Sequence, residues 1–403
     1  MTKSKDLPDG WTIKPMPEVV TWGSGGTPKA TQSAYYSGGK IPWLIIGDLN
    51  DRIVTESQSK ITKLGLKNSN AKMIPPGTLM VAMYGSIGKL GITGIECCTN
   101  QAIAFAKELR GVTTKYMFYY LTIMKSKLIS MGKGGTQKNI SLTVLKSIDV
   151  IVPPINVQAK IVFQIEELTS ALDKSVETLR TIKKQLAVYR QAVLKEAFET
   201  CIKKGVQEKN IDGICDVIVD CPHSTPKWTS SGKLCLRTTN FRRGYLDLTE
   251  PNYVSQDTFD DRTTRLRPKP GDVLYSREGA ILGLACIIPD RLEVCLGQRM
   301  MLLRTCSSVN SRFLMHYLNS PYLSSVISEN IGGSASPHIN VGDIKKFNIP
   351  IPNIRIQDVI VQMIESRLSV CDSIEQTVNT ALAQANAMRQ SILKQAFEGG
   401  LTQ

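Results

Sequence analysis

Apolar residues recur at helical spacing in two long stretches of the chain. In the first, apolar positions from Ile161 to Ala197 advance 36 residues in ten steps, which is the 3.6-residue period of an α-helix. In the second, positions from Val361 to Ala396 advance 35 residues in ten steps. Neither stretch contains Pro or Gly, and prolines stand just ahead of each, where a helix can begin. The pattern predicts two long, coiled-coil-like helices.

Each predicted helix carries one apolar stripe, which has to be buried. A helix of about 40 residues is roughly 60 Å long, so it extends beyond its own domain. The second helix of the same chain is then the obvious partner. We therefore predict an antiparallel intramolecular pair, with a globular domain at each end in a pseudo-two-fold arrangement. The alternative is that each helix packs separately against its own domain.

The chain repeats itself at an offset of 199 residues. The sequence RQAVLKEAFE at residues 190–199 recurs as RQSILKQAFE at 389–398, with seven identities in ten. Further pairs at this offset are Pro153 with Pro352, Gln158 with Gln357, and Asp173 with Asp372. The repeat continues upstream at nearly the same spacing, where Thr27-Pro28-Lys29 corresponds to Thr225-Pro226-Lys227. The chain is therefore two copies of one unit, each a variable globular part followed by a better matched helix.

The globular parts have the pattern of α/β or α+β structure. The predicted strands lie within residues 40–46, 78–83, 233–237 and 272–275. Residues 115–131 and 311–330 have helical character, and a glycine-rich loop follows each, at 132–139 and 332–338. The fold class is thus two similar globular domains separated by two long antiparallel coiled-coil-like helices.

Charge is distributed unevenly along the chain. The 49 Lys and Arg against 35 Asp and Glu give a net charge of +14. By segment the net charges are +10 for 1–150, +1 for 151–199, +4 for 200–348 and −1 for 349–403. The excess therefore belongs to the globular parts, and it favours a polyanionic partner, most commonly nucleic acid. The first part draws its charge from Lys, whereas Arg dominates the second, and Arg suits bidentate reading of guanine.

Signals of catalysis, metal binding and membrane insertion are lacking in the sequence. There is no phosphate-binding loop, no dinucleotide motif and no Asn-Pro-Pro-aromatic motif of an adenine methyltransferase. The spacing of Cys215, Cys221, His223 and Cys235 fits no usual zinc site. No apolar run approaches the length of a membrane span, and the N-terminus lacks the apolar core of a signal peptide. We expect a cytoplasmic protein with no catalytic residue and no metal.

The doubled helix motif carries a resemblance to a known family. Each long helix opens with Pro-x4-Gln and closes on Leu-Lys-x-Ala-Phe-Glu, and the chain starts with Leu7-Pro8-Asp9-Gly10-Trp11. Together with two divergent globular parts, this resembles the specificity subunit of type I restriction-modification systems. The resemblance implies target recognition domains at 1–150 and 201–348, and spacer helices at 151–200 and 349–403.

The resemblance also implies a function and a set of partners. Each domain would recognise one half of a bipartite double-stranded DNA sequence, and the helices would act as a ruler and dock two methyltransferase subunits. Restriction subunits with ATP-driven translocation would join that core. Methyl transfer to adenine N6, with S-adenosylmethionine, ATP and Mg, would belong to the partners, so this subunit needs no cofactor.

Within that frame, site residues can be suggested by residue type and by placement on loops and strand ends. The DNA-binding candidates are Lys29, Tyr35, Tyr36, Lys89, Lys133, Gln137, Lys138 and Asn139 in the first domain, and Lys227, Arg237, Asn240, Arg242, Arg243, Arg277, Ser334, Ser336 and His338 in the second. Arg, Asn and Gln can pair with base edges, whereas Lys and Ser more often bind phosphates. The partner-docking candidates are Arg190, Phe198, Arg389 and Phe397, although the repeated helix ending could equally serve helix packing.

A second hypothesis belongs to another class. The chain could be a non-catalytic coiled-coil adaptor that binds only proteins, with its positive charge incidental. An enzyme acting on acidic glycans is a weaker option, because no paired carboxylates support it. A DNA reader predicts an affinity that falls steeply with salt, and an adaptor predicts no such binding.

Overall fold

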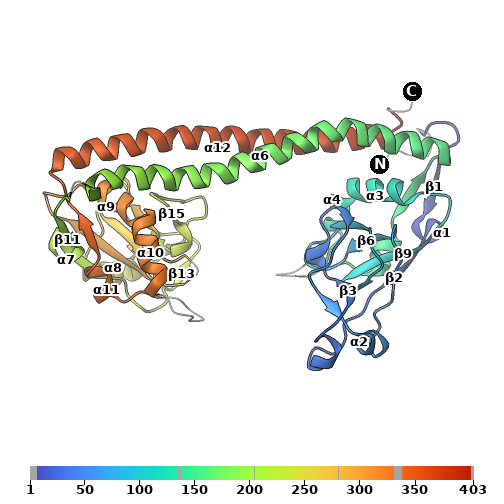
Figure 1. The fold of residues 1–403 in the computed structure, drawn as a ribbon, viewed down its shortest axis with the longest axis horizontal. Coiled ribbons are helices and arrows are strands. Elements are labelled where there is room, and N and C mark those ends of the chain that lie inside the picture. The colour runs from blue at the N-terminus through green and yellow to red at the C-terminus, as the bar shows by residue number, and fades with distance from the viewer. Residues whose placement is uncertain (1–6, 135–137, 204, 280, 331–337, 401–403) are drawn as a thin grey trace. The chain divides into compact units, whose positions relative to one another are not determined.

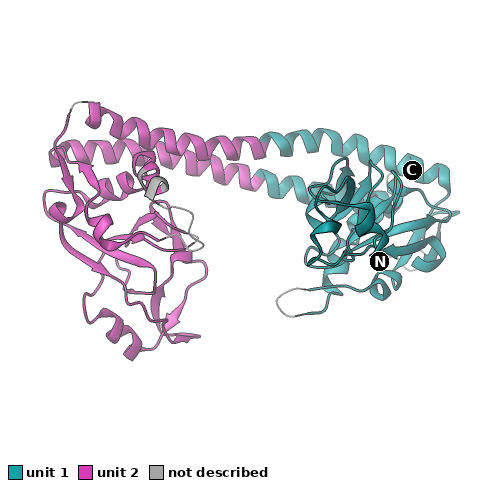
Figure 2. Ribbon diagram, turned by 60° about the horizontal axis from the view of Figure 1, so that its bottom comes forward, with its two compact units in different colours: residues 1–178, 381–403 teal, residues 179–380 magenta. Residues whose placement is uncertain are grey.

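The computed structural model describes residues 7–134, 138–203, 205–279, 281–330 and 338–400. The chain divides into two compact units: unit 1 is Met1–Thr178 with Ala381–Gln403, and unit 2 is Leu179–Thr380. Each unit combines one globular part with a stretch of both long helices (Figure 2). The domain boundaries suggested by the sequence stay a prediction, because the division into units cuts through both helices.

The globular part of unit 1 is built on a five-stranded mixed sheet of order β2-β9-β6-β7-β4. Its strands are β2 (Val20–Ser24), β9 (Ile103–Leu109), β6 (Leu79–Ala82), β7 (Leu90–Thr93) and β4 (Arg52–Val54). A smaller three-stranded sheet consists of β5 (Lys60–Ile61), β3 (Ile41–Leu44) and β8 (Cys98–Thr99). A two-stranded sheet pairs β1 (Thr12–Pro15) with β10 (Asp149–Val152). The helices are α1 (Met16–Val19), α2 (Lys63–Lys67), α3 (Thr114–Ile123), α4 (Lys125–Ser130) and α5 (Leu142–Lys146), with 3-10 turns η2 (Ser33–Tyr35) and η3 (Ile46–Asp48).

Unit 2 repeats this plan around a four-stranded sheet of order β12-β21-β18-β19. Figure 1 shows its globular part beneath a stretch of the long helices. Its strands are β12 (Cys215–Asp220), β21 (Met300–Thr305), β18 (Val273–Ser276) and β19 (Ala285–Ile287). The remaining strands are β13 (Trp228–Thr229), β17 (Tyr253–Val254), β14 (Lys233–Leu236), β20 (Cys295–Leu296), β15 (Phe241–Arg242), β16 (Tyr245–Leu246), β11 (Glu208–Asn210) and β22 (Asn348–Pro350). The helices are α7 (Ile211–Ile214), α8 (Gln256–Thr263), α9 (Ser311–Leu318), α10 (Pro321–Asn330) and α11 (Val341–Lys345), with the 3-10 turn η4 (Thr238–Asn240).

The two long helices are α6 (Ile155–Lys203) and α12 (Ile354–Phe397). In unit 1 the beginning of α6 shares a core with the end of α12, where Ile165 and Phe397 belong to one apolar cluster. In unit 2 the end of α6 shares a core with the beginning of α12, where Leu194 and Val361 belong to one cluster. The predicted helices and their antiparallel pairing are thus confirmed within each unit. Both clusters also include residues of the globular part, so the helices stabilise their domains as well as each other.

The Pro-x4-Gln motif joins each long helix to its globular part. Gln158 is completely buried, and its Nε2 donates to the carbonyls of Pro153 at 2.9 Å and Gly111 at 2.8 Å. Its Oε1 accepts from the N–H of Thr113, the N-cap of α3, at 3.0 Å. Gln357, also completely buried, makes the same three kinds of bond in unit 2. One buried amide in each unit therefore fixes where α6 or α12 begins relative to α3 or α9.

The predicted mixed α and β character of the globular parts is confirmed. Each of the four predicted strands overlaps an observed one, namely β3, β6, β14 and β18. Residues 115–131 and 311–330 form α3 with α4 and α9 with α10.

Candidate nucleic-acid interface

In unit 1 the paired strands β6 and β9 end at a hydrogen-bonded corner. The Met83 N–H, one residue beyond β6, donates to the Ala102 carbonyl at 2.8 Å. The Ile140 N–H, just after the glycine-rich loop, donates to the Met83 carbonyl at 2.9 Å. The neighbouring residues Tyr84 and Asn139 form a β-bridge. This corner brings the ends of two strands to the end of the loop.

Unit 2 has the same corner with different side chains. The Arg277 N–H, one residue beyond β18, donates to the Arg299 carbonyl at 3.0 Å, and the Ile339 N–H donates to the Arg277 carbonyl at 2.9 Å. Glu278 and His338 form the β-bridge. The corners of the two units therefore correspond position by position in their backbone bonds.

A threonine–glutamine bond attaches the Thr-Pro-Lys loop to each corner. In unit 1 the Thr27 hydroxyl is hydrogen-bonded to the Gln101 amide oxygen, and in unit 2 the Thr225 hydroxyl donates to the Gln298 Oε1 at 3.3 Å. Gln298 also donates to the His223 carbonyl. Each glutamine stands one residue before the corner, so the loop and the strand ends form one connected surface. Sequence reasoning selected the Thr-Pro-Lys loops as repeat landmarks but left both glutamines out of the candidate set.

The lysines of the two loops are free to reach a ligand. Lys29 and Lys227 are both exposed, two residues beyond the attached threonine. In unit 2 the next residue, Trp228, lies under Arg237, with the guanidinium carbon 5.4 Å from the ring centre. Arg237 is exposed and directly follows β14, which pairs with β20. The structure thus places Arg237 over the residue that follows Lys227 in the sequence.

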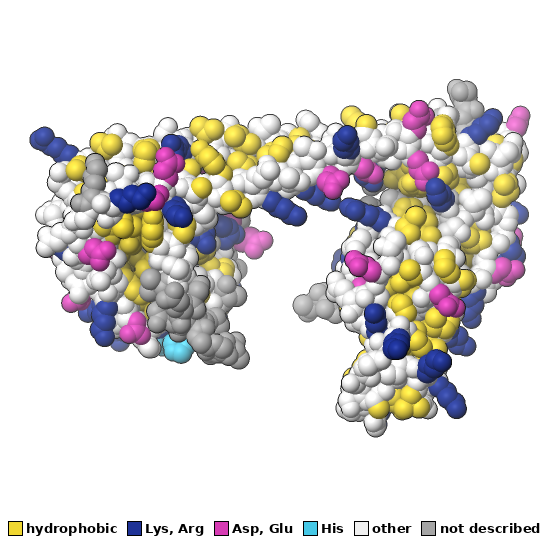
Figure 3. Space-filling model, viewed as in Figure 1, with side chains coloured by type: hydrophobic (Ala, Val, Ile, Leu, Met, Phe, Trp, Pro, Cys, Tyr) yellow, Lys and Arg dark blue, Asp and Glu magenta, His cyan; other side chains and the backbone are white. Residues whose placement is uncertain are grey.

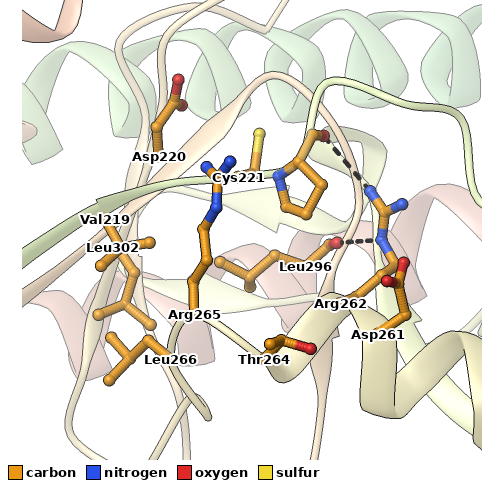
Figure 4. Close-up of a pocket in the computed structure, with 11 residues that line it drawn as sticks. Val219, Asp220, Cys221, Asp261, Arg262, Thr264, Arg265, Leu266, Leu296 and Leu302 are labelled. Carbon is orange, nitrogen blue, oxygen red and sulfur yellow. Dashed lines mark hydrogen bonds between the residues drawn. The ribbon is translucent and has the colours of Figure 1, made fainter.

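Arg262 also anchors this loop, although it was not among the DNA-binding candidates selected from the sequence. It is 6% exposed, and Figure 4 shows its guanidinium bonded to backbone carbonyls beside a cavity of about 300 Å³. It donates to the Leu296 carbonyl at 2.7 Å, to the Gly297 carbonyl at 3.0 Å, and to the Ser224 and Pro222 carbonyls at 3.2 and 3.4 Å. Since Ser224 and Gly297 precede the threonine and the glutamine, Arg262 holds both ends of that bond in place.

Arg277 is buried, which corrects its prediction as a base-reading residue. Its side chain is 7% exposed, with Nε and Nη2 2.8 and 3.0 Å from the two carboxylate oxygens of Asp220. Its Nη1 lies 3.2 Å from Glu278 Oε1. The guanidinium N–H groups of Arg277 are hydrogen-bonded to Asp220 and Glu278 inside the fold. Arg277 therefore orients Glu278 and is not exposed to a partner.

Asn240, another DNA-binding candidate, is also buried. It is 5% exposed; its Oδ1 accepts from a backbone N–H three residues earlier at 2.9 Å, and its Nδ2 donates to the Asp247 carbonyl at 3.0 Å. It caps η4 and supports the loop behind it. Arg242, in the same loop, is half-buried and pairs with the Asp247 carboxylate at 2.7 Å. Hydrogen bonds from Thr249, together with Arg242, hold the pKa of Asp247 below its usual value.

Two tyrosine candidates of unit 1 lie behind the Thr-Pro-Lys loop. Tyr36 is half-buried, and its hydroxyl donates to the Pro28 carbonyl at 2.5 Å. Tyr35 is half-buried at the end of η2. Tyr36 therefore holds the loop that presents Lys29, which gives it a supporting role.

Two basic candidates are bonded to backbone carbonyls. The Lys89 ammonium donates to the Ile46 carbonyl at 3.4 Å, and the Arg243 guanidinium donates to the Asn319 carbonyl at 3.1 Å. Arg243 is nonetheless exposed and Lys89 partly so. Both keep donors available at the surface.

The glycine-rich loops supply the remaining candidates. Lys133, Lys138 and Asn139 are exposed, and Asn139 Oδ1 accepts from the Gly85 N–H at 3.3 Å. His338 is exposed at the corner of unit 2. The candidates that lie outside the described residues are Gln137, Ser334 and Ser336.

The aromatic docking candidates at the helix ends are buried inside the folded units. Phe198 is completely buried, with its ring 5.2 Å from Phe313 and 5.0 Å from Tyr317. Phe397 is 3% exposed and packs 5.3 Å from Tyr116 and 5.4 Å from Tyr120. Each phenylalanine fills the pocket between a long helix and α9 or α3, so neither ring is available to a partner.

The two arginine docking candidates pair the helices with each other. Arg190 Nη2 lies 2.7 Å from Asp372 and 2.9 Å from Glu375 in unit 2. Arg389 pairs with Asp173 in unit 1. Helix packing, the alternative for the repeated ending, therefore explains these four residues.

Within the described residues, no group of three or more His, Cys, Asp or Glu side chains is placed to hold a metal ion. None of the ten cysteines forms a disulfide, and most are buried. No helix in the described parts of the chain has the length and apolar character needed to cross a membrane.

These features define a class: a protein of two similar mixed α/β domains joined by two long helices, with one common corner and different side chains on each copy. The chain belongs to the family of type I restriction modification DNA specificity domains, which matches residues 8–186 and 203–384. With two such domains, it is a specificity subunit that carries two target recognition domains.

Known relatives agree with this assignment over nearly the whole chain. The chain is 23% identical to the type I restriction enzyme EcoKI specificity subunit of Escherichia coli, over 98% of this chain and 90% of the relative. It is 24% identical to the StySPI specificity subunit of Salmonella potsdam, over the same shares of each chain. A solved chain from a study of complex assembly and conformational transition of the type I R-M system shares the fold, with a TM-score of 0.62, 16% identity and coverage of 97% of this chain and 98% of that one.

Proposed function

We propose that this chain gives a type I restriction-modification complex its DNA sequence specificity. Each globular domain binds one half of a bipartite target, and α6 and α12 set the distance between the halves. The chain is non-catalytic by itself and works in the cytoplasm, where the DNA is.

The corners carry this proposal. Both units repeat the same backbone bonds and the same threonine–glutamine attachment, so the two corners are built for one kind of task. The side chains on them differ, with Tyr84 and Asn139 in unit 1 and Glu278, Arg299 and His338 in unit 2. A common scaffold with different polar side chains is what two readers of different base sequences require.

Charge and position assign roles among the candidates. Lys29 and Lys227 are exposed at matching places and suit phosphate binding, because an ammonium on a flexible stem is a poor reader of base edges. Arg237, held over Trp228, has the pre-oriented fork that base reading needs. The net charges of +10 and +4 on the two domain segments favour approach to the DNA backbone.

The helices supply a docking surface for two methyltransferase subunits. Figure 3 shows hydrophobic side chains exposed along the long helices. The largest exposures are those of Val188 at 71%, Phe163 at 67%, Val359 at 64% and Met388 at 58%. Apolar side chains this exposed on a helix favour contact with a partner. S-adenosylmethionine, ATP and Mg belong to the methyltransferase and the restriction subunits of the complex.

Salt-dependent DNA binding by the complex with its methyltransferase subunits tests the proposal. We expect the logarithm of the affinity to fall linearly with the logarithm of salt concentration, and Lys29→Ala and Lys227→Ala each to reduce the slope by about 1. Lys174→Ala, which removes an exposed lysine from α6, is the matched control and leaves the slope unchanged. A complex that forms but binds DNA without salt dependence would favour the protein-binding adaptor instead.

A further inference from the structure

We propose that Arg299 and Glu278 read one G·C base pair in the half-site bound by unit 2. Arg299 belongs to the arginines that dominate the second globular part, but neither residue is among the DNA-binding candidates selected from the sequence. Arg299 stands one residue before β21, and Glu278 stands two residues after β18, its partner strand. The inference rests on the proposed function and assigns its base-reading groups in this unit.

Arg299 occupies a backbone conformation that disfavours its own side chain. Its φ is +69°, and the non-glycine residues with positive φ in the described chain are Asp51, Arg291 and Arg299. A glycine would adopt this conformation at no steric cost, whereas an arginine carries a strain penalty here. Such outliers concentrate at functional sites.

The backbone on both sides of Arg299 is fixed. Gln298 before it is held by Thr225 and by the His223 carbonyl, and the Met300 N–H after it donates to Cys221 Sγ at 3.3 Å. The side chain between these anchors is 58% exposed. The strained backbone thus presents a long cationic group at the surface of the corner.

Glu278 is positioned beside this arginine. Its carboxylate lies 3.2 Å from Nη1 of the buried Arg277 and 3.9 Å from Nε of Arg299, and its side chain is 31% exposed. Gly279, with φ +85°, leaves room for the arginine: a Cβ there would lie 3.3 Å from Arg299 Nη1. Arg277 in turn is locked by Asp220. A carboxylate anchored by Arg277 and an exposed guanidinium therefore stand side by side.

This pair of groups matches the major-groove edge of one G·C pair. The guanidinium fork donates to guanine O6 and N7, and the carboxylate accepts from the cytosine amino group. In unit 1 the matching positions are Ala102, which is buried, and Tyr84, which is 40% exposed. Unit 1 lacks the charged pair at these positions, so the two half-sites are read by different chemistry.

The test uses the complex of this chain with its methyltransferase subunits. Methylation rates are measured on duplexes that carry the native bipartite site and on duplexes with each other base pair at every half-site position. Arg299→Gly, which suits the backbone, and Glu278→Gln are each expected to lower the preference for one G·C pair by roughly tenfold or more. Preferences in the other half-site stay unchanged.

Arg291→Gly is the matched control, because Arg291 is exposed in unit 2 with a φ of +63°. It removes the same side chain from the same conformation and is expected to leave every preference intact. The inference is overturned if Arg299→Gly and Glu278→Gln slow methylation equally on all duplexes, or if they leave the base preferences unchanged. In either case the proposed function still stands as long as the unaltered complex prefers the native bipartite site. If the unaltered complex has no bipartite preference, the proposed function itself fails.

Discussion

Replacing the buried glutamine at the start of a long helix is expected to destabilise one unit strongly. In unit 2 Gln357 donates to the carbonyls of Pro352 at 2.8 Å and Ser308 at 3.1 Å, and it accepts from the Asn310 N–H at 2.8 Å. Each hydrogen bond contributes about 1 kcal/mol net, and the partners left behind are shielded from water. Gln357→Ala should therefore lower the free energy of unfolding by about 3 kcal/mol, a large share of a typical domain's stability.

Urea unfolding combined with hydrogen exchange measures this loss and locates it. Gln357→Ala should raise the exchange rates of α9 in unit 2, and Gln158→Ala should do the same for α3 in unit 1, because these helices lose the contact at their N-caps. Gln185→Ala, at an exposed position of α6, is the control with the same change of residue type. The reasoning is refuted if the buried and exposed substitutions shift the urea midpoint equally.

Two further outcomes follow from the structure. Phe198→Ala and Phe397→Ala should each cost about 3–5 kcal/mol in thermal unfolding, since each ring fills an aromatic pocket; an unchanged unfolding temperature with loss of complex assembly would restore their docking role. Burial lowers the pKa of His316 to about 4, from about 6.5 in the unfolded chain, so between these pH values the unfolded state binds a proton that the folded state excludes. Stability should therefore fall by about 3 kcal/mol as pH drops from about 6.5 to 4. This loss of stability should be smaller in His316→Gln than in the unaltered chain. Urea unfolding that depends on pH equally in both would contradict this prediction.

The long helices could be predicted because their signal is local. An apolar stripe of period 3.6 indicates a helix whatever it packs against, and the repeat at an offset of 199 indicated that both helices do the same job. Which apolar side chains of each long helix pack against its own globular part could not be predicted. The ring of Phe198 contacts Phe313, and the ring of Phe397 contacts Tyr116, so only the folded chain shows that these rings are internal.

The candidate site was predictable only where it followed the repeat. The Thr-Pro-Lys loops were found because their spacing nearly matches between the copies, and a similar comparison of Gln101 with Gln298 would have revealed the attachment of each loop. Arg277 was misassigned because its residue type suits base reading, whereas its partner Asp220 lies 57 residues away. Arg299 was left out of the DNA-binding candidates because nothing in the local sequence indicates its positive φ.

Methylome sequencing tests the central claim most directly. A host without adenine methylation expresses the methyltransferase subunit either with this chain or alone. The account predicts a split, adenine-methylated motif that appears only when this chain is present. A complex that co-purifies intact but methylates no such motif would contradict it.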